Sequence, residues 1–187
     1  MAVLVEAISV IVRRDAIDAR FSGGWSEFLN AIPNGSFCAD EELARIGFMT
    51  PQDVEAFVRR LERGGLTFVR KGKAIDMAVV DQVRGPTVPA EWLEFAHLPH
   101  GDTGGEVAAC WLYEGPRFGA GIHMPAKEMM LAIPDGWTYE DSLSAGFQFV
   151  ANEEMDEKLK FLRHEDGRDV YLNLSSGQEV FVGRAQA

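Results

Sequence analysis

Helix-forming patterns are concentrated in the N-terminal half of the chain, and the apolar segments that follow have the length and spacing of strands. The clearest helix is predicted from "TPQDVEAFVRRLERGGL", where Thr50 is suited to the N-cap, Pro51 to the first helical position, and Gly64 and Gly65 to the end. Its apolar residues recur with helical spacing, so one face is expected to be buried. Because helices do not alternate regularly with strands, the sequence argues against a doubly wound sheet and predicts an α+β fold.

The N-terminal segment "VLVEAISVIV", residues 3–12, is apolar on both alternating faces apart from Glu6 and Ser9. This pattern predicts one central strand that is covered on both sides. Asp15 is expected to cap a short helix after this strand. A further helix is predicted over residues 25–32, where apolar residues recur at helical spacing before a Pro-Asn-Gly turn.

Strand-like segments bounded by Gly or Pro follow the capped helix, at residues 66–72, 74–83, 91–98, 106–115 and 128–134. The last part of the chain, residues 158–184, has turn-forming sequences at residues 165–167 and 175–177, which predicts an antiparallel meander of three strands. We therefore expect a mostly antiparallel sheet, a few helices in the N-terminal half and a C-terminal three-strand meander.

The domain organisation expected from the sequence is a single compact α+β unit over residues 1–187. The Gly-rich segment "LPHGDTGGE", residues 98–106, is the best candidate boundary, and it would divide the chain into two subdomains, 1–98 and 106–187. The same segment equally fits a hairpin loop within one domain.

The chain carries a net charge of −11, and the excess is uneven: residues 1–100 hold 11 Lys and Arg against 14 Asp and Glu, whereas residues 101–187 hold 7 against 15. Such a field repels nucleic acid and attracts a basic protein partner or a cationic ligand, although an acidic surface also simply keeps a bacterial-type cytosolic protein soluble. The sequence has no segment with the features of a signal peptide or a membrane span, so no membrane association is expected. The two cysteines, Cys38 and Cys110, are expected to be free, reduced and partly buried, which favours a cytoplasmic location.

The first candidate for a functional site is the end of the apolar segment at residues 74–83, where Asp81, Gln82 and Arg84 precede a Gly-Pro turn. Polar side chains at the end of a buried strand are held rigidly and remain accessible, which suits binding. Asp81 and Arg84 would equally serve as a structural pair that fixes the turn.

Aromatic residues form a second candidate for ligand or partner binding. Trp92 follows the loop after Arg84, Trp111 and Tyr113 alternate along one predicted strand, and Arg117 lies beyond them. If these side chains were exposed, they would form a binding surface of the kind that interfaces favour; if buried, they belong to the core.

Three histidines are the candidate ligands of a metal ion. His97 is expected at a strand end, His100 in the loop after it and His123 in a later loop, with Asp102 as an alternative ligand. Their spacing matches no established zinc pattern, and no cofactor is predicted.

The chain also lacks a nucleophile motif, a complete phosphate-binding glycine loop and a calcium loop. The primary expectation is therefore a non-enzymatic binding protein that docks a basic protein or a cationic ligand through its acidic surface, as an inhibitor or immunity-type neutraliser does. One alternative is a small-molecule enzyme or sensor with a pocket near Asp81 and Arg84, assisted by a metal at the histidines. Another is a structural subunit of a homo-oligomer.

Overall fold

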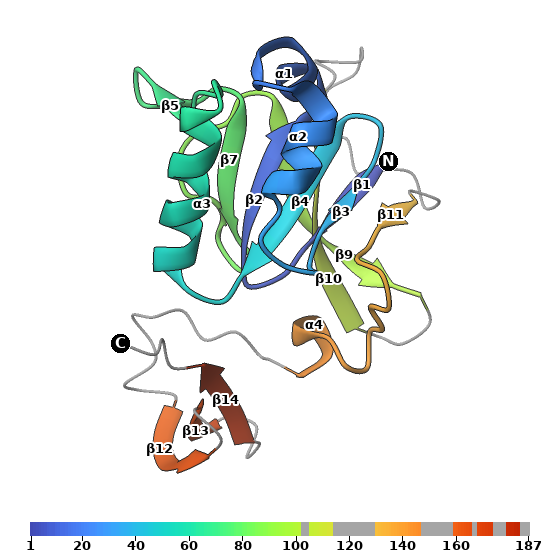
Figure 1. The fold of residues 1–187 in the computed structure, drawn as a ribbon. Helices are drawn as coiled ribbons and strands as arrows, with labels where there is room; N and C mark the ends of the chain where they lie inside the picture. The colour runs from blue at the N-terminus through green and yellow to red at the C-terminus, as the bar shows by residue number, and fades with distance from the viewer. Residues whose placement is uncertain (102–104, 114–129, 147–158, 166–167, 174–178, 184–187) are drawn as a thin grey trace. The chain divides into compact units, whose positions relative to one another are not determined.

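The computed structural model of the chain describes residues 1–101, 105–113, 130–146, 159–165, 168–173 and 179–183. The chain forms two units, Met1–Trp137 and Thr138–Ala187. Both consist largely of antiparallel strands, and the α+β class expected from the sequence is confirmed (Figure 1).

The N-terminal unit contains two main sheets. The larger sheet has five strands in the order β3 (Cys38–Ala39), β4 (Leu43–Phe48), β2 (Ile8–Arg13), β7 (Met77–Asp81) and β8 (Gly85–Pro86). The smaller sheet has the order β11 (Leu131–Ala132), β1 (Ala2–Val5), β10 (Gly105–Leu112) and β9 (Leu93–His100). Neighbouring strands are antiparallel except for β1 and β11, which run parallel. A separate hairpin pairs β5 (Val69–Arg70) with β6 (Lys73–Ala74).

Alternation of side chains along the strands gives this unit three layers. One face of the five-stranded sheet packs against α1 (Arg14–Arg20), α2 (Gly24–Ala31) and α3 (Pro51–Arg63), which lie on the same side of it in Figure 1. The opposite face, which includes Ile11, Leu43 and Val80, packs against Val3 and Cys110 of the smaller sheet. Side chains of both cores are almost completely buried, so the hydrophobic effect holds the three layers together.

The predicted helix after Thr50 is confirmed in detail. The Thr50 side chain accepts a hydrogen bond from the backbone N–H of Asp53, Pro51 is the first helical residue, and Gly64 follows the last. The residues with helical apolar spacing are the buried ones. The helix expected at residues 25–32 is also present as α2.

Two local predictions near the N-terminus are wrong. The segment expected as one strand forms β1 and β2, which belong to different sheets, and Ala7 between them has a positive φ of 49°. Both strands are buried on both faces, so the pattern identified the burial correctly but not the break. Asp15 does not cap α1; it lies in the first helical turn, and the N-cap residue is Arg13.

The candidate boundary near residue 100 lies between two strands that pair with each other. β9 and β10 are antiparallel neighbours from Leu93 opposite Leu112 to His100 opposite Gly105. Both strands lie within the N-terminal unit, which extends to Trp137. A subdomain boundary at this position remains a prediction from the sequence.

The C-terminal unit contains the predicted meander. β12 (Leu159–Glu165), β13 (Arg168–Asn173) and β14 (Glu179–Gly183) are antiparallel neighbours in this order, and a short helix, α4 (Leu143–Gly146), precedes them. In the described part of the chain, no helix has the length and apolar character needed to cross a membrane.

Candidate functional site

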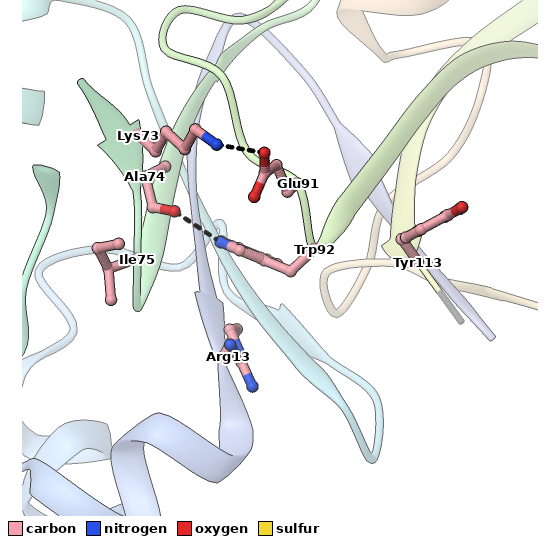
Figure 2. A pocket seen from close by; sticks show the side chains of 7 residues that line it. All are labelled: Arg13, Lys73, Ala74, Ile75, Glu91, Trp92 and Tyr113. Atoms are coloured by element: carbon pink, nitrogen blue, oxygen red, sulfur yellow. Dashed lines mark hydrogen bonds and ion pairs between the residues drawn. The ribbon is translucent and has the colours of Figure 1, made fainter. Parts of the chain in front are cut away.

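A pocket of about 410 Å³ lies where strands of both main sheets end. Its wall consists of residues from four separate parts of the chain: Arg13, Lys73, Ala74, Ile75, Glu91, Trp92 and Tyr113 (Figure 2). Arg13 ends β2, Lys73 and Ala74 form β6, and Trp92 precedes β9. Since β9 and β10 are antiparallel, Tyr113 at the end of β10 comes back to the start of β9. Pockets at such junctions are common ligand sites.

Trp92 is held in place by both its backbone and its side chain. The indole Nε1–H donates a hydrogen bond to the backbone oxygen of Ala74 at 3.1 Å, as Figure 2 shows. The backbone oxygen of Trp92 accepts from the N–H of Tyr113 at 2.8 Å, and the N–H of Ala74 donates to Pro89 at 2.8 Å. A buried indole normally has a partner for its N–H, and here that partner fixes the ring in the pocket wall.

Charged side chains lie on both sides of the Trp92 ring. The Arg13 guanidinium carbon is 5.8 Å from the ring centroid, within the range of a cation–π interaction. Arg13 also pairs with Asp15, and its Nε is 3.0 Å from Asp15 Oδ1. On the other side in Figure 2, Lys73 forms an ion pair with Glu91. The Lys73 and Glu91 side chains are 52% and 74% exposed, so this pair contributes little free energy and its members can exchange partners readily.

The structure brings two of the predicted binding residues, Trp92 and Tyr113, into this pocket. The sequence did not point to Arg13, Lys73 or Glu91. Two sequence features could have indicated these cations as site residues. Arg13 lies directly after the apolar N-terminal segment, and Lys73 belongs to the cationic run "RKGK", residues 70–73.

Asp81, Gln82 and Arg84 do not line the pocket, and their described contacts are structural. The Asp81 carboxylate accepts hydrogen bonds from the backbone N–H groups of Val83 and Arg84, both at 2.9 Å, which fixes the turn after β7. Gln82 is buried, and its side-chain oxygen accepts a hydrogen bond from the backbone N–H of Ala7 at 2.7 Å. The backbone N–H of Gln82 donates to the backbone oxygen of Ala7 at 2.9 Å. Gln82 thus holds the point at which the chain passes from one sheet to the other.

The remaining aromatic candidates lie elsewhere. Trp111 is half-buried on β10, opposite Glu94 of β9, on the other face of the strand from the core residue Cys110. It does not line the pocket. Arg117 lies outside the described residues.

The histidine pair is not brought together. His97 and His100 both belong to β9, whereas His100 was expected in the following loop. Side chains three positions apart in a strand project from opposite faces. His97 Nε2 is 2.9 Å from the backbone oxygen of Gln82, and the His100 ring packs edge-on against Trp137 at 5.6 Å.

Within the ranges that the structure describes, no group of three or more His, Cys, Asp or Glu side chains is arranged to hold a metal ion. His123 and Asp102, the other predicted ligands, lie outside those ranges.

The two thiols are free and buried, as expected. Burial raises the pKa of Cys38 from its ordinary value of 9.0 to about 11, with Arg45 opposing part of this change. Burial also raises the pKa of Cys110, which is fully enclosed. A thiol with a raised pKa carries little thiolate at neutral pH and is a poor nucleophile.

The buried cation beside these thiols is Arg45, which is 2% exposed. Its Nε donates to Ser9 Oγ at 2.9 Å, and its terminal nitrogens donate to the backbone oxygens of Ser36 at 2.8 Å and Glu6 at 3.1 Å. Burial lowers the pKa of Arg45, because water no longer stabilises the charged form. These contacts tie β4 to β2, to Glu6 in the link between β1 and β2, and to Ser36 before β3. Sequence reasoning did not single this residue out.

Comparisons of the chain with protein-family models, with curated proteins and with solved structures found no match. The function must therefore be inferred from the chain's own residues.

Proposed function

We propose that this protein is a binding protein whose recognition site is the pocket around Trp92. The observation that carries the proposal is the combination of a fixed aromatic wall with charged side chains whose present partners are exposed and exchangeable. Ligand pockets typically combine a preformed, largely apolar wall with a few polar groups that orient the ligand. The volume of about 410 Å³ suits a small molecule or the side chain of a partner.

A binding role rather than catalysis is supported by the chemistry of the wall. Arg13 and Lys73 are cations at neutral pH, and the indole of Trp92 uses its only hydrogen-bond donor on Ala74. Glu91 is the only carboxylate among the described residues of the wall, and it pairs with Lys73. A guanidinium, an ammonium group and a fixed indole are suited to holding and orienting a ligand.

The test is a titration with small aromatic probes followed by the indole N–H resonances in ¹H–¹⁵N NMR spectra. The chain has four tryptophans, so W92F identifies the Trp92 resonance by its disappearance. We use neutral, cationic and anionic naphthalene derivatives: 2-naphthylmethanol, 2-naphthylmethylammonium and 2-naphthoate. Binding of any one of them with a selective shift at Trp92 supports the proposal. Unchanged spectra with all of them, or equal shifts at all tryptophans, contradict it.

A pocket-filling variant supplies the matched control. Ile75→Trp places a bulky ring in the wall and is expected to abolish binding measured by calorimetry. Leu29→Trp makes a comparable change on the exposed surface of α2 and is expected to leave binding unchanged. If both variants bound the probe with equal affinity, the probe would bind outside the Trp92 pocket and the proposal would be contradicted.

Docking of a basic protein remains a second candidate, because residues 101–187 carry 15 acidic against 7 basic side chains. Such association should be fast at low salt and weaken as salt screens the charges. A pull-down that recovers a basic partner at low salt and loses it at high salt supports this candidate. Recovery of no partner at either salt concentration counts against it.

A further inference from the structure

The Trp92 pocket has a local charge opposite in sign to that of the whole chain. Arg13 and Lys73 lie in its wall, and the exposed residues Arg70 and Lys71 belong to the same hairpin as Lys73. Among the residues that the structure describes, Glu91 is the single carboxylate in the wall, and Asp15, which pairs with Arg13, is a second one beside it; the net charge of the whole chain is −11. A cluster of cations at a pocket mouth concentrates anionic ligands by attraction, even when the rest of the surface repels them.

The hairpin that carries these cations has two features that are unfavourable for its stability. Arg70 and Lys73 are directly opposite each other on β5 and β6, where like charges repel. At the tip, Lys71 and Gly72 have positive φ values of 51° and 75°. A two-residue turn of this kind favours Asn or Asp before Gly, because those residues tolerate the left-handed conformation better. Both features involve cations of the hairpin that carries the pocket residue Lys73, and attraction of an anionic ligand gives a reason for both.

The geometry of the wall indicates what this anion is attached to. Figure 2 shows Lys73 and Arg13 on opposite sides of the Trp92 indole. Trp92 and Ile75 offer apolar surface for a flat ring, while Lys73 can leave its exposed partner Glu91 for a ligand oxygen. Carboxylate and phosphate oxygens form strong, charge-assisted hydrogen bonds with ammonium and guanidinium groups.

We infer that the ligand of the Trp92 pocket is an aromatic oxyanion, with its ring against Trp92 and its carboxylate or phosphate group at Lys73. This inference rests on the proposed function and specifies its ligand class. The hairpin β5–β6 contributes by its charge, so it is a specificity-determining element of the same site.

The test compares four probes that share one ring: 2-naphthoate, 2-naphthyl phosphate, 2-naphthylmethanol and 2-naphthylmethylammonium. Calorimetry gives the affinities, and the Trp92 indole resonance confirms the location. We expect the tighter of the two anionic probes to bind about tenfold more tightly than the neutral one, and the cation to bind most weakly. The comparison between carboxylate and phosphate identifies the oxyanion.

Two variants report on the cations. K73Q should weaken the anionic probes about threefold and leave the neutral probe unchanged, because Lys73 is half exposed. K71N should retain or raise the melting temperature, since Asn suits the turn, and should weaken the anionic probes only at low salt. R59Q removes an equal charge from the exposed face of α3 and should change neither the affinity for the anionic probes nor that for the neutral probe.

The outcomes distinguish the two proposals. If the neutral or cationic probe binds Trp92 as tightly as the anions, or if K73Q and K71N bind the anions as the unaltered protein does, the inference is overturned while the pocket remains a binding site. If no probe shifts the Trp92 resonance, the proposed function fails and the inference fails with it.

Discussion

Gly47 is expected to be intolerant of even one added methyl group, because of the buried guanidinium of Arg45. A Cβ at position 47 would lie 2.5 Å from Arg45 Nη2 and 2.9 Å from Cζ, far inside van der Waals contact. The Arg45 side chain is long, but it cannot move freely, since hydrogen bonds to Ser9, Ser36 and Glu6 hold its nitrogens in a buried site. Gly47 does not have a positive φ, so the constraint comes from space and not from backbone conformation.

The size of the destabilisation in G47A follows from the hydrogen bond that Arg45 must lose. Loss of one charge-assisted hydrogen bond costs about 1.5–3 kcal/mol. Replacing a strand glycine with alanine by itself raises the free energy of unfolding by about 0.5–1 kcal/mol, because alanine loses less backbone entropy on folding. The free energy of unfolding should therefore fall by about 0.5–2.5 kcal/mol, which lowers the melting temperature by roughly 1–10 °C for a chain of this size. Urea denaturation followed by tryptophan fluorescence measures the change.

A double-mutant cycle with R45M isolates the cause. Methionine removes the guanidinium, so G47A should be neutral or stabilising in that background, with a coupling energy of about 1 kcal/mol or more. Gly35→Ala is the control, because its Cβ would have no neighbour within 4 Å and its φ is not positive. The reasoning is refuted if G47A is as stable as the unaltered protein, or if its effect is the same with and without Arg45.

Four further predictions concern other groups. D76N should lower the free energy of unfolding by about 1–3 kcal/mol in urea denaturation, because the fully buried Asp76 carboxylate accepts a backbone hydrogen bond and pairs with Arg20; an unchanged midpoint would contradict this. T50A should cost about 1 kcal/mol through loss of the α3 cap, whereas T50S, which keeps the hydroxyl, should cost much less; equal effects would rule the cap out as the cause. Cys38 and Cys110 should resist alkylation at pH 8 in the folded protein and react after denaturation, and labelling of the folded chain at the unfolded rate would contradict their burial. Burial raises the pKa of Cys38 in the folded chain from 9.0 to about 11, so the unfolded chain loses this proton at lower pH. The contribution of the Cys38 thiol to the free energy of unfolding is therefore complete below pH 9 and declines between pH 9 and about 11. In denaturation measured across this pH range, the free energy of unfolding of C38A should decline less steeply than that of the unaltered protein.

Local patterns predicted the elements whose determinants are close together in the sequence. Thr50, Pro51 and Gly64 mark the ends of α3 because capping acts on backbone groups within one turn. The same holds for the C-terminal meander, whose paired strands are consecutive in the sequence. The break between β1 and β2 escaped detection, because a run of apolar residues indicates burial on both faces without indicating which sheet provides it.

The candidate site was predicted only in part. Trp92 and Tyr113, which line the pocket, are predicted as binding residues from their type, since aromatic side chains favour interfaces. Arg13 and Lys73 are 60 positions apart in the sequence and line one pocket only because the tertiary structure brings the end of β2 and strand β6 to it. Asp81 and Gln82 were chosen because they follow a buried strand, but a strand end also needs groups that satisfy the backbone, and that is what their described contacts do.

The sequence by itself determined the α+β class, the capped helix, the C-terminal meander and the burial of the two cysteines. Each depends on hydrophobic periodicity, turn chemistry or composition, which act over a few residues. The tertiary structure decided the division of the N-terminal segment between two sheets, the opposite faces of His97 and His100, the buried position of Arg45 and the pocket around Trp92. These features depend on strand order and register, which bring together residues that are distant in the sequence.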